Sequence, residues 1–356
     1  MQRLVIIPEK WEHHIRQSCP DQILEHLQDV EEYDHPGPDL DCLPPMFFKN
    51  LGCVPNLRTA YGEPAFRREV ALCARMQREQ GTLYHFLNGE SAVFLTPRHK
   101  GGNRIMATYH LPAAFMETII PDKSHFPLHD AVVVVAPNQV EYFQGLAGAD
   151  KVHFIPLGVE VDVFPFGPAE ERCPRVLFVG NWLRDFPALV QATARINALA
   201  PEVEVVCVTP EANHPLFAGL DVDLRCNIPT ADLLELYRTS SALLFPLADC
   251  TANTALLEAM CSGLPVVTNR MILDTGYLTE ETAFLAPDGD GEAMADACIE
   301  LARDEVLRAR QSHAIRQWVT ERFNWPCVAA MYARLYARLG LEVQLRRPRL
   351  LPGGRA

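Results

Sequence analysis

The chain alternates between short apolar runs and longer stretches with a helical pattern. The apolar runs are rich in Val, Ile, Leu and Phe, which is typical of strands buried on both faces of a parallel sheet. The expected strands lie at 4–7, 92–95, 105–109, 131–135, 152–155, 176–179, 203–208, 242–245 and 265–267. The expected helices lie at 65–80, 113–119, 139–146, 187–199, 231–239 and 255–261, and further helices run from 290 to about 339. This alternation predicts an α/β fold with helices on both faces of parallel sheets.

The chain divides into two halves. A segment rich in Pro, Gly and acidic residues at 158–174 interrupts the alternation and is predicted to be a linker. Because a domain has roughly 150 residues, a chain of 356 residues is expected to hold two. The regular alternation on both sides of the linker predicts two Rossmann-like domains in tandem.

The composition argues against several classes of protein. A hydrophobic fraction of 48% with 22% charged residues is ordinary for a globular chain, and the formal net charge of -13 argues against a nucleic-acid partner. The 11 cysteines include no C-x-x-C pair, so they carry no zinc signature and fit reduced, buried thiols in a cytoplasmic protein. The start lacks the pattern of a secretory signal, and no apolar run approaches the roughly 20 residues that span a bilayer.

The most informative stretch runs from 242 to 267. It reads as an apolar strand, a loop of small polar residues, a short helix that ends before Gly263, and the start of another strand. A helix that begins beyond a strand's carboxyl end points its free N–H groups and partial positive charge at one place, where a phosphate can bind. Thr254 and Glu258 are four residues apart and share one face of this helix. The layout suits a nucleotide diphosphate with its ribose at Glu258; the alternative is an ordinary helix with a surface glutamate.

The sequence of this helix resembles a known signature. Residues 257–267 read LEAMCSGLPVV, which is similar to the LEAMACGLPVV run of the glycosyltransferases of family four. These enzymes have the GT-B fold, in which two Rossmann-like domains with parallel sheets face a central cleft. The resemblance implies a retaining glycosyltransferase that moves a hexose to an acceptor hydroxyl. The donor substrate would be a UDP- or GDP-linked sugar, with neither a cofactor nor a metal.

Three further segments resemble the same family. The run IPLGVE at 155–160 is similar to the IPNGVD segment that joins the two domains, and FNW at 323–325 is similar to the FSW start of a closing helix. The strand end ATYHLP at 107–112 resembles the one that carries an active-site histidine. We therefore expect an acceptor domain at 1–160, a donor domain at 175–325, a helix returning to the first domain at 326–340 and a disordered tail at 341–356.

The resemblance implies that the donor nucleotide binds to the second domain. Glu258 matches the family glutamate that holds the ribose. Asn253 and Thr254 stand in the loop that meets the diphosphate, with helix capping as the structural alternative for both. Counting back through the family's Glu-x7-Glu motif reaches Cys250 instead of glutamate. Asp249 is therefore the expected substitute for contact with the sugar.

The loop after the first strand of the second half also departs from the family. Gly180 is kept, but Asn181 and Phe186 stand where the family has the arginine and lysine that bind the diphosphate. Arg184 is the predicted phosphate cation, with a solvated loop arginine as the structural alternative. Arg270 is a second candidate, for which a surface arginine is the favoured interpretation.

His110 ends an apolar strand of the first half. A lone histidine at a strand end is more often a satisfied structural residue. The resemblance makes His110 a predicted catalytic residue that contacts the sugar near the reacting centre, together with Asp249. The adjacent pair His13 and His14 does not have the spacing of a metal site, and no Asp-x-Asp pair is placed to hold a metal.

The sequence leaves the acceptor and two other functions open. A glycan, a lipid-linked sugar and a small molecule all remain compatible as acceptors. The tail arginines attract acidic lipid only modestly, so a solvated tail is favoured over peripheral contact with the inner face of a membrane. A sugar-nucleotide-binding or scaffold protein without turnover is one alternative, and a nucleotide-sugar epimerase is the other. A nicotinamide dehydrogenase is disfavoured because no G-x-G-x-x-G follows a strand. The tail arginines are Arg346, Arg347, Arg349 and Arg355.

Overall fold

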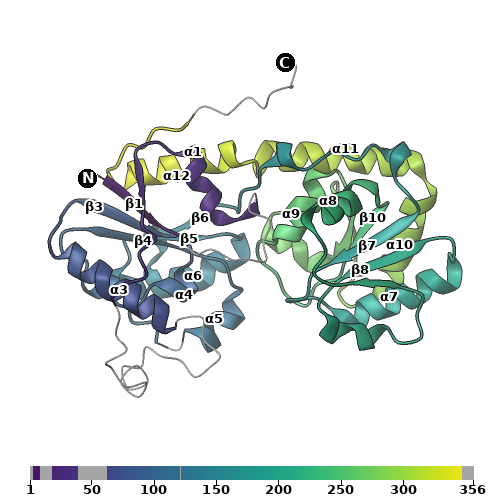
Figure 1. Ribbon diagram of the computed structural model, residues 1–356, viewed down its shortest axis with the longest axis horizontal. Helices are drawn as coiled ribbons and strands as arrows, with labels where there is room; N and C mark the ends of the chain where they lie inside the picture. The colour runs from purple at the N-terminus through teal and green to yellow at the C-terminus, as the bar shows by residue number, and fades with distance from the viewer. Residues whose placement is uncertain (1–2, 9–17, 39–61, 121, 347–356) are drawn as a thin grey trace. The chain divides into compact units, whose positions relative to one another are not determined.

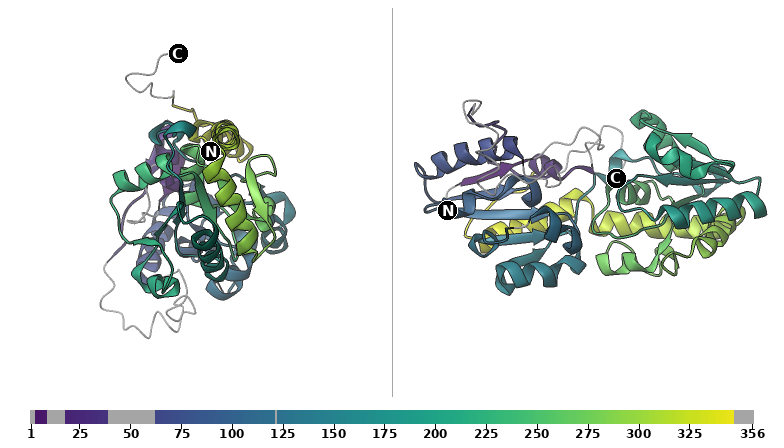
Figure 2. Two further views of the ribbon diagram at one scale, coloured as in Figure 1. Left: turned by 90° about the vertical axis from the view of Figure 1, so that its right-hand side faces the viewer. Right: turned by 90° about the horizontal axis from the view of Figure 1, so that it is seen from below.

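The chain folds into two compact units, each built from one parallel sheet with helices on both faces (Figures 1 and 2). The computed structural model describes residues 3–8, 18–38, 62–120 and 122–346. Ser18 and residues 159–324 make up the second unit, and the other described residues make up the first. The predicted α/β class and the two Rossmann-like domains are confirmed.

The sheet of the first unit has the strand order β2-β1-β3-β4-β5-β6, and each neighbouring pair is parallel. The order reverses between β1 and β3, which makes this point a place where an open α/β sheet can bind a ligand at its carboxyl edge. The strands are β1 Arg3–Ile7, β2 Val30–Glu32, β3 Thr82–Phe86, β4 Arg104–Tyr109, β5 Ala131–Val134 and β6 Val152–Phe154. The helices are α1 Ile23–His26, α3 Glu63–Met76, α4 Gly89–Ala92, α5 Ala113–Ile119, α6 Val140–Ala147 and α12 Trp325–Arg338.

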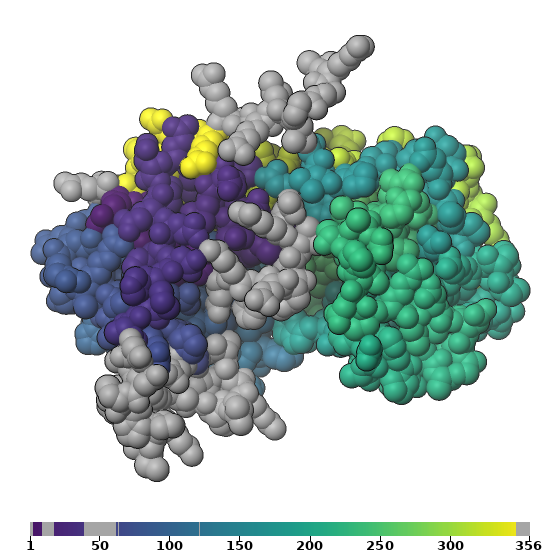
Figure 3. Space-filling view, in the orientation of Figure 1, coloured from purple at the N-terminus to yellow at the C-terminus, as the bar shows by residue number. Residues whose placement is uncertain are grey.

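Side chains at alternate positions along the strands point to opposite faces of the first sheet and pack into two hydrophobic cores. One face packs on α3, α5 and α6, whose buried side chains include Leu72, Met116 and Phe143. The other face packs on α1 and α12. The residues after α12 lie beside the N-terminal segment, where the N–H of Gln28 donates to the carbonyl oxygen of Gln344 at 2.9 Å. In Figure 3 the yellow C-terminal atoms accordingly lie against purple atoms of the segment that contains α1.

The sheet of the second unit has the strand order β12-β11-β10-β7-β8-β9, again with parallel neighbours. Its order reverses between β7 and β10, so its expected ligand edge is the carboxyl end of these two strands. The strands are β7 Arg175–Val179, β8 Glu204–Val208, β9 Asp223–Arg225, β10 Ala242–Phe245, β11 Val266–Asn269 and β12 Ala283–Ala286. The helices are α7 Phe186–Leu199, α8 Thr230–Thr239, α9 Thr254–Cys261, α10 Gly291–Arg303 and α11 Glu305–Arg322.

Short polar side chains start the helices of the second unit. Asp185, Asn253, Asp290 and Asp304 each accept the N–H group three residues further on, which satisfies one of the donors that open a helix. Helix α8 is the exception, because its cap position is occupied by Pro229 and Thr230 is its first residue.

The strand predicted at 92–95 is wrong. Strand β3 lies earlier in the chain, and Ala92 ends the short helix α4. The next N–H groups, from Phe94 to Thr96, donate to the buried carboxylate of Glu69 at 2.8–3.0 Å. A side chain therefore satisfies the backbone donors that a strand would pair with a neighbour.

Other differences concern edges and the connection. Strands β2, β9 and β12, which were not predicted, are short strands at the edges of the two sheets. The predicted linker packs into the second unit, where Val161 and Phe164 are buried. His13, His14 and the tail from 347 onward lie outside the described residues. In the described ranges the cysteines are free, and no helix is long and apolar enough to cross a membrane.

Candidate functional site

Two loops meet where the strand order of the second sheet reverses. One loop follows β7 and the other follows the neighbouring strand β10. The N–H of Ala248 donates to the carbonyl oxygen of Leu183 at 3.0 Å, and the N–H of Asp185 donates to that of Pro246 at 3.1 Å. The loops thus form a short antiparallel bridge at Arg184. This pairing fixes Arg184 at the carboxyl edge of the sheet.

Arg184 is a buried cation without a counter-ion. Its side chain is 8% exposed, and its guanidinium stacks on the ring of Phe245 at 4.1 Å. It donates to the carbonyl oxygens of Trp182 at 3.0 Å and Val179 at 3.4 Å, and no carboxylate among the described residues pairs with it. Burial lowers the pKa of Arg184 to about 10, which leaves it charged at neutral pH. Because an unpaired buried charge is costly, this place favours the arrival of an anion.

Gly180 lets the guanidinium lie close to the end of β7. Its φ of +115° lies in a region that favours glycine, and a Cβ atom there would be 2.8 Å from Nη2 of Arg184. The backbone therefore turns away from the sheet at Gly180 and leaves the space that Arg184 occupies.

We expect Gly180→Ala to lower the free energy of unfolding by about 1–3 kcal/mol, because alanine is strained at this φ and its methyl group displaces Arg184. Thermal unfolding measures the change. Gly145→Ala is the matched control: Gly145 lies within α6, has no positive φ and leaves open space for a methyl group. Alanine should be neutral or stabilising there. An unchanged Tm for Gly180→Ala would contradict this account of the turn.

The start of α9 lies beside Arg184. Oδ1 of Asn253 accepts the N–H of Leu256 at 3.3 Å and a hydrogen bond from Nη2 of Arg184, also at 3.3 Å. Thr254 is the first helical residue. The partial positive charge of the helix start therefore adds to that of the guanidinium. The structure brings Gly180, Arg184, Asn253 and Thr254 to one place, and Asn253 combines helix capping with contact to the cation.

Glu258 lies one turn further along α9 and is buried, with 4% of its surface exposed. Its Oε1 accepts from the hydroxyl of Ser18 at 2.6 Å, and its Oε2 accepts from the hydroxyl of Tyr237 at 3.1 Å. Burial raises the pKa of Glu258, while these two hydrogen bonds oppose the shift. Burial and the nearby Glu258 raise the pKa of Tyr237, so its phenol stays protonated and donates. Each carboxylate oxygen has two lone pairs, which leaves each able to accept one further donor.

Glu258 should make stability depend on pH. Because burial raises its pKa above the unfolded value, its contribution is fully present below the unfolded pKa and is lost as pH rises through the folded pKa. We expect the Tm of Glu258→Gln, relative to wild type, to increase as pH rises from about 4 towards neutrality. Thermal unfolding of both proteins across this range measures the difference.

The control for this pH effect has the opposite sign. Glu235 lies exposed on α8, and its hydrogen bond with Arg238 lowers its pKa. Glu235→Gln should therefore lose stability relative to wild type as pH rises, by a smaller amount because solvent screens the pair. A Tm difference for Glu258→Gln that stays constant with pH would contradict the assignment.

The loop between β10 and α9 carries Asp249 and Cys250. Oδ1 of Asp249, which is half-buried, accepts the N–H of Cys250 at 2.7 Å. Burial raises the pKa of the Cys250 thiol to about 12, so it stays protonated and offers no carboxylate-like acceptor. Asn269 at the end of β11 stabilises this loop. Its side chain accepts the N–H of Leu247 at 2.9 Å and donates to the carbonyl oxygen of Leu247 at 2.8 Å.

His110 belongs to the first unit and lies at the carboxyl end of β4. Its Nε2 is 2.7 Å from the carbonyl oxygen of Leu87, which assigns the proton to this nitrogen. Oε1 of Glu90 accepts the N–H groups of both His110 and Leu111, the latter at 2.8 Å. Glu90 is 3% exposed, and its Oε2 has no hydrogen-bond partner. Glu90 thus fixes the strand end while one buried carboxylate oxygen stays unsatisfied.

The sequence analysis did not identify three of these partners. Tyr237 and Ser18 meet Glu258 from other parts of the chain, so no local pattern could indicate them. Glu90 follows β3 closely, and a carboxylate at the carboxyl end of a parallel strand is a usable signal. Arg270, the second candidate cation, is an exposed arginine paired with Glu280.

Two other buried arginines show how Arg184 differs. Arg172 and Arg308 donate to several backbone carbonyl oxygens at 2.7–3.2 Å. Their donors are satisfied by the fold itself. Nη2 of Arg184 reaches only Asn253 and a carbonyl oxygen, at 3.3–3.5 Å. Burial alone therefore does not indicate anion binding. Arg184 differs because the hydrogen bonds of its Nη2 are long and because it lies at the carboxyl edge of the sheet.

Comparison with known proteins gives a family match within the second unit. Residues 173–304 match the family model of glycosyl transferases group 1. The chain is 30% identical over 219 residues to phosphatidyl-myo-inositol mannosyltransferase of Mycobacterium leprae, covering 56% of this chain and 57% of that protein. It is 26% identical over 245 residues to D-inositol 3-phosphate glycosyltransferase of Corynebacterium glutamicum, covering 59% and 58%. The chain therefore spans less than two thirds of the length of these curated relatives.

Solved structures resemble the whole described fold. The Anabaena protein HepE in complex with UDP and glucose has a TM-score of 0.69 at 12% identity, covering 94% of this chain and 99% of that one. Sucrose-phosphate synthase from Thermosynechococcus elongatus has a TM-score of 0.68 at 17% identity, covering 96% and 99%. Residues 173–304 thus resemble a group 1 glycosyltransferase domain, and the chain has the fold of two Rossmann-like domains seen in these GT-B structures.

Proposed function

We propose that this protein is a retaining glycosyltransferase that moves a hexose from a nucleoside-diphosphate sugar to an acceptor hydroxyl without a metal. The donor binds to the second unit, with its diphosphate at Arg184 and the start of α9. Glu258 holds the ribose, and Asp249 contacts the sugar. His110, in the first unit, contacts the sugar near the reacting centre. The retaining stereochemistry follows the resemblance to family four.

The observation that carries this proposal is the unpaired charge of Arg184. Cleavage of the bond between the anomeric carbon and the phosphate builds negative charge on the departing diphosphate. Catalysis needs fixed positive groups at that point. A buried guanidinium beside a helix start supplies them without rearrangement.

The comparisons support the substrate class. The matched relatives are named as glycosyltransferases, and HepE was solved with UDP and glucose. Ribose hydroxyls donate hydrogen bonds, and both oxygens of Glu258 already accept from hydroxyl groups. The ribose of a UDP- or GDP-linked hexose can donate hydrogen bonds to these carboxylate oxygens. The acceptor substrate would be a glycan, a lipid-linked sugar or a small molecule.

A sugar-nucleotide-binding protein without turnover is the second candidate. The observation that favours it is the protonated thiol of Cys250, at the position where the family has a carboxylate. Asp249 presents a carboxylate next to it, and its half-buried position leaves the side chain open to a sugar hydroxyl. We favour the enzyme because the carboxylate of Asp249 can accept hydrogen bonds from the sugar in place of the missing family glutamate.

Incubation with a panel of UDP-, GDP- and ADP-sugars separates these functions. Nucleotide release, followed by mass spectrometry and lost in Glu258→Ala, is the result that we expect for the enzyme. Binding without release would support the silent protein, and interconversion of sugars without release would support an epimerase. Absence of both binding and release for every donor would contradict all three.

A further inference from the structure

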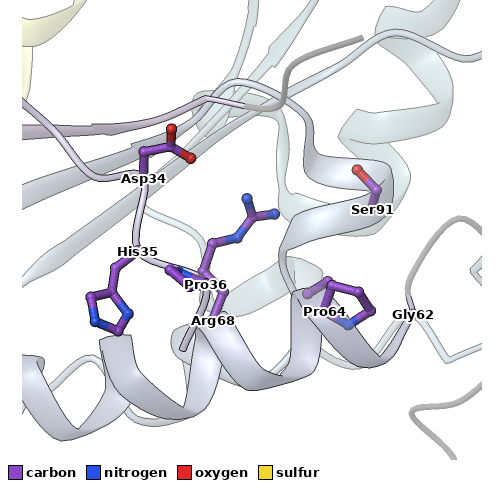
Figure 4. Close-up of a pocket in the computed structure, with 8 residues that line it drawn as sticks. Asp34, His35, Pro36, Gly62, Pro64, Arg68 and Ser91 are labelled. Atoms are coloured by element: carbon purple, nitrogen blue, oxygen red, sulfur yellow. The ribbon is translucent and has the colours of Figure 1, made fainter. Parts of the chain in front are cut away.

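A cavity of about 280 Å³ lies at the carboxyl edge of the first unit's sheet. Its walls come from the segment after β2, from the start of α3 and from α4, which follows β3 (Figure 4). These elements surround the point where the strand order of this sheet reverses. None of the site residues predicted from the sequence lines this cavity. The lining residues are Asp34, His35, Pro36, Gly62, Pro64, Ala65, Arg68 and Ser91.

Arg68 supplies the positive charge of this cavity. In Figure 4 its guanidinium lies between Asp34 and Ser91. Its Nε is buried without a hydrogen-bond partner, and its Nη1 reaches only the carbonyl oxygen of Pro8, at 3.4 Å. In the part of the chain that the structure describes, Arg68 forms no ion pair. Most of its five N–H donors therefore lack an acceptor among the described residues.

A second arginine of the same helix shows the contrast. Arg75 lies two turns further along α3 and makes a bidentate pair with Glu31, at 2.6 and 2.8 Å. It also donates to Glu79 at 2.8 Å. Arg75 is thus a structural arginine whose donors are used by the fold. Arg68 has the same chemistry, but its donors face a cavity.

We infer that this cavity binds an oxyanion, such as a phosphate group, carried on a hydroxylated molecule. The planar fork of Arg68 matches two oxygens of such a group, and the start of α3 adds partial positive charge. Asp34 lies on another wall of the cavity, in the segment after β2. Its carboxylate can accept from hydroxyl groups and disfavours a molecule that is anionic throughout. Resting on the proposed function, this inference makes the acceptor an anionic sugar or polyol, held by the unit that also carries His110.

Chemical modification of arginine tests the inference on the whole protein. Phenylglyoxal modifies arginine, and peptide mass spectrometry measures the rate at Arg68. We expect excess inorganic phosphate, compared with chloride at equal ionic strength, to slow this rate about fivefold or more, because the bound anion occupies the fork. The rate at Arg75 is the internal control and should not change. Equal rates at Arg68 with phosphate and chloride would overturn the inference.

Variants make the test independent of folding and of donor chemistry. Asp34→Asn should strengthen the protection of Arg68 by phosphate, because it removes a negative charge that repels the anion. Weaker or equal protection would show that the anion binds elsewhere. Phosphate should also raise the Tm of wild type and of Arg78→Gln, an exposed arginine of the same region, but not that of Arg68→Gln. Equal shifts in all three would count against the cavity.

Two further probes distinguish the source of the anion. Protection by glycerol phosphate supports a soluble acceptor, whereas protection by phosphatidylglycerol vesicles alone supports a lipid headgroup. Donor turnover is measured separately with UDP-sugars. Donor turnover without protection of Arg68 by phosphate would contradict this inference but agree with the proposed function. Protection of Arg68 without donor turnover would support this inference and contradict the proposed function.

Discussion

Arg184→Met should reduce nucleotide release from the preferred donor sugar about 100-fold or more, because it removes the buried charge that stabilises the leaving diphosphate. Methionine fills most of the space over Phe245, so the loss should lie in kcat and in diphosphate affinity more than in folding. Steady-state kinetics and calorimetry with UDP measure both quantities. A variant that keeps wild-type turnover would show that Arg184 does not meet the diphosphate.

The matched control for this variant is Arg270→Met. Arg270 follows β11 in the same unit, but it is exposed and paired with Glu280. Its removal should change turnover little, because a solvent-exposed pair contributes little energy. A loss at Arg270→Met as large as that at Arg184→Met would indicate a general electrostatic effect of the unit and not a contact at the site.

Glu258→Ala should weaken nucleotide binding about 10- to 100-fold, because charge-assisted hydrogen bonds to the ribose are lost. The ribose is common to UDP and UMP, so both nucleotides should lose the same factor. Arg184→Met, in contrast, should weaken UDP far more than UMP. Calorimetric titration of the two nucleotides against each variant gives these ratios.

A milder variant distinguishes loss of the ribose contact from loss of the local fold. Tyr237→Phe keeps Glu258 but removes the hydroxyl that donates to its Oε2. It should lower affinity for UDP and UMP equally, by less than Glu258→Ala. Selective loss of UDP binding in either variant would contradict the assignment of Glu258 to the ribose.

Local patterns predicted the helix and strands that surround the proposed donor site, whereas its long-range contacts could not be predicted from them. The run from 257 to 267 predicted α9, the next strand and the turn at Gly263, whose φ is +66°. The position of Arg184 after a strand also indicated it as a candidate phosphate-binding residue. It could not show that the guanidinium lacks a counter-ion, since that depends on which segments surround it.

The failures have physical causes as well. The apolar run at 92–95 looks like a strand, but Glu69 captures its backbone donors from a distant helix. The cavity at Arg68 gathers residues from three separate segments, none of which carries a motif. The arginines of α3 look alike in sequence, and only their partners distinguish Arg75 from Arg68, the one that we propose to bind an anion.

The most direct test of the account is the affinity of the wild-type protein for UDP, GDP and ADP, each compared with its monophosphate. We predict that at least one diphosphate binds about tenfold more tightly than its monophosphate, because the second phosphate meets Arg184 and the start of α9. Equal affinity for diphosphate and monophosphate in every pair, or no binding of any nucleotide, would contradict it.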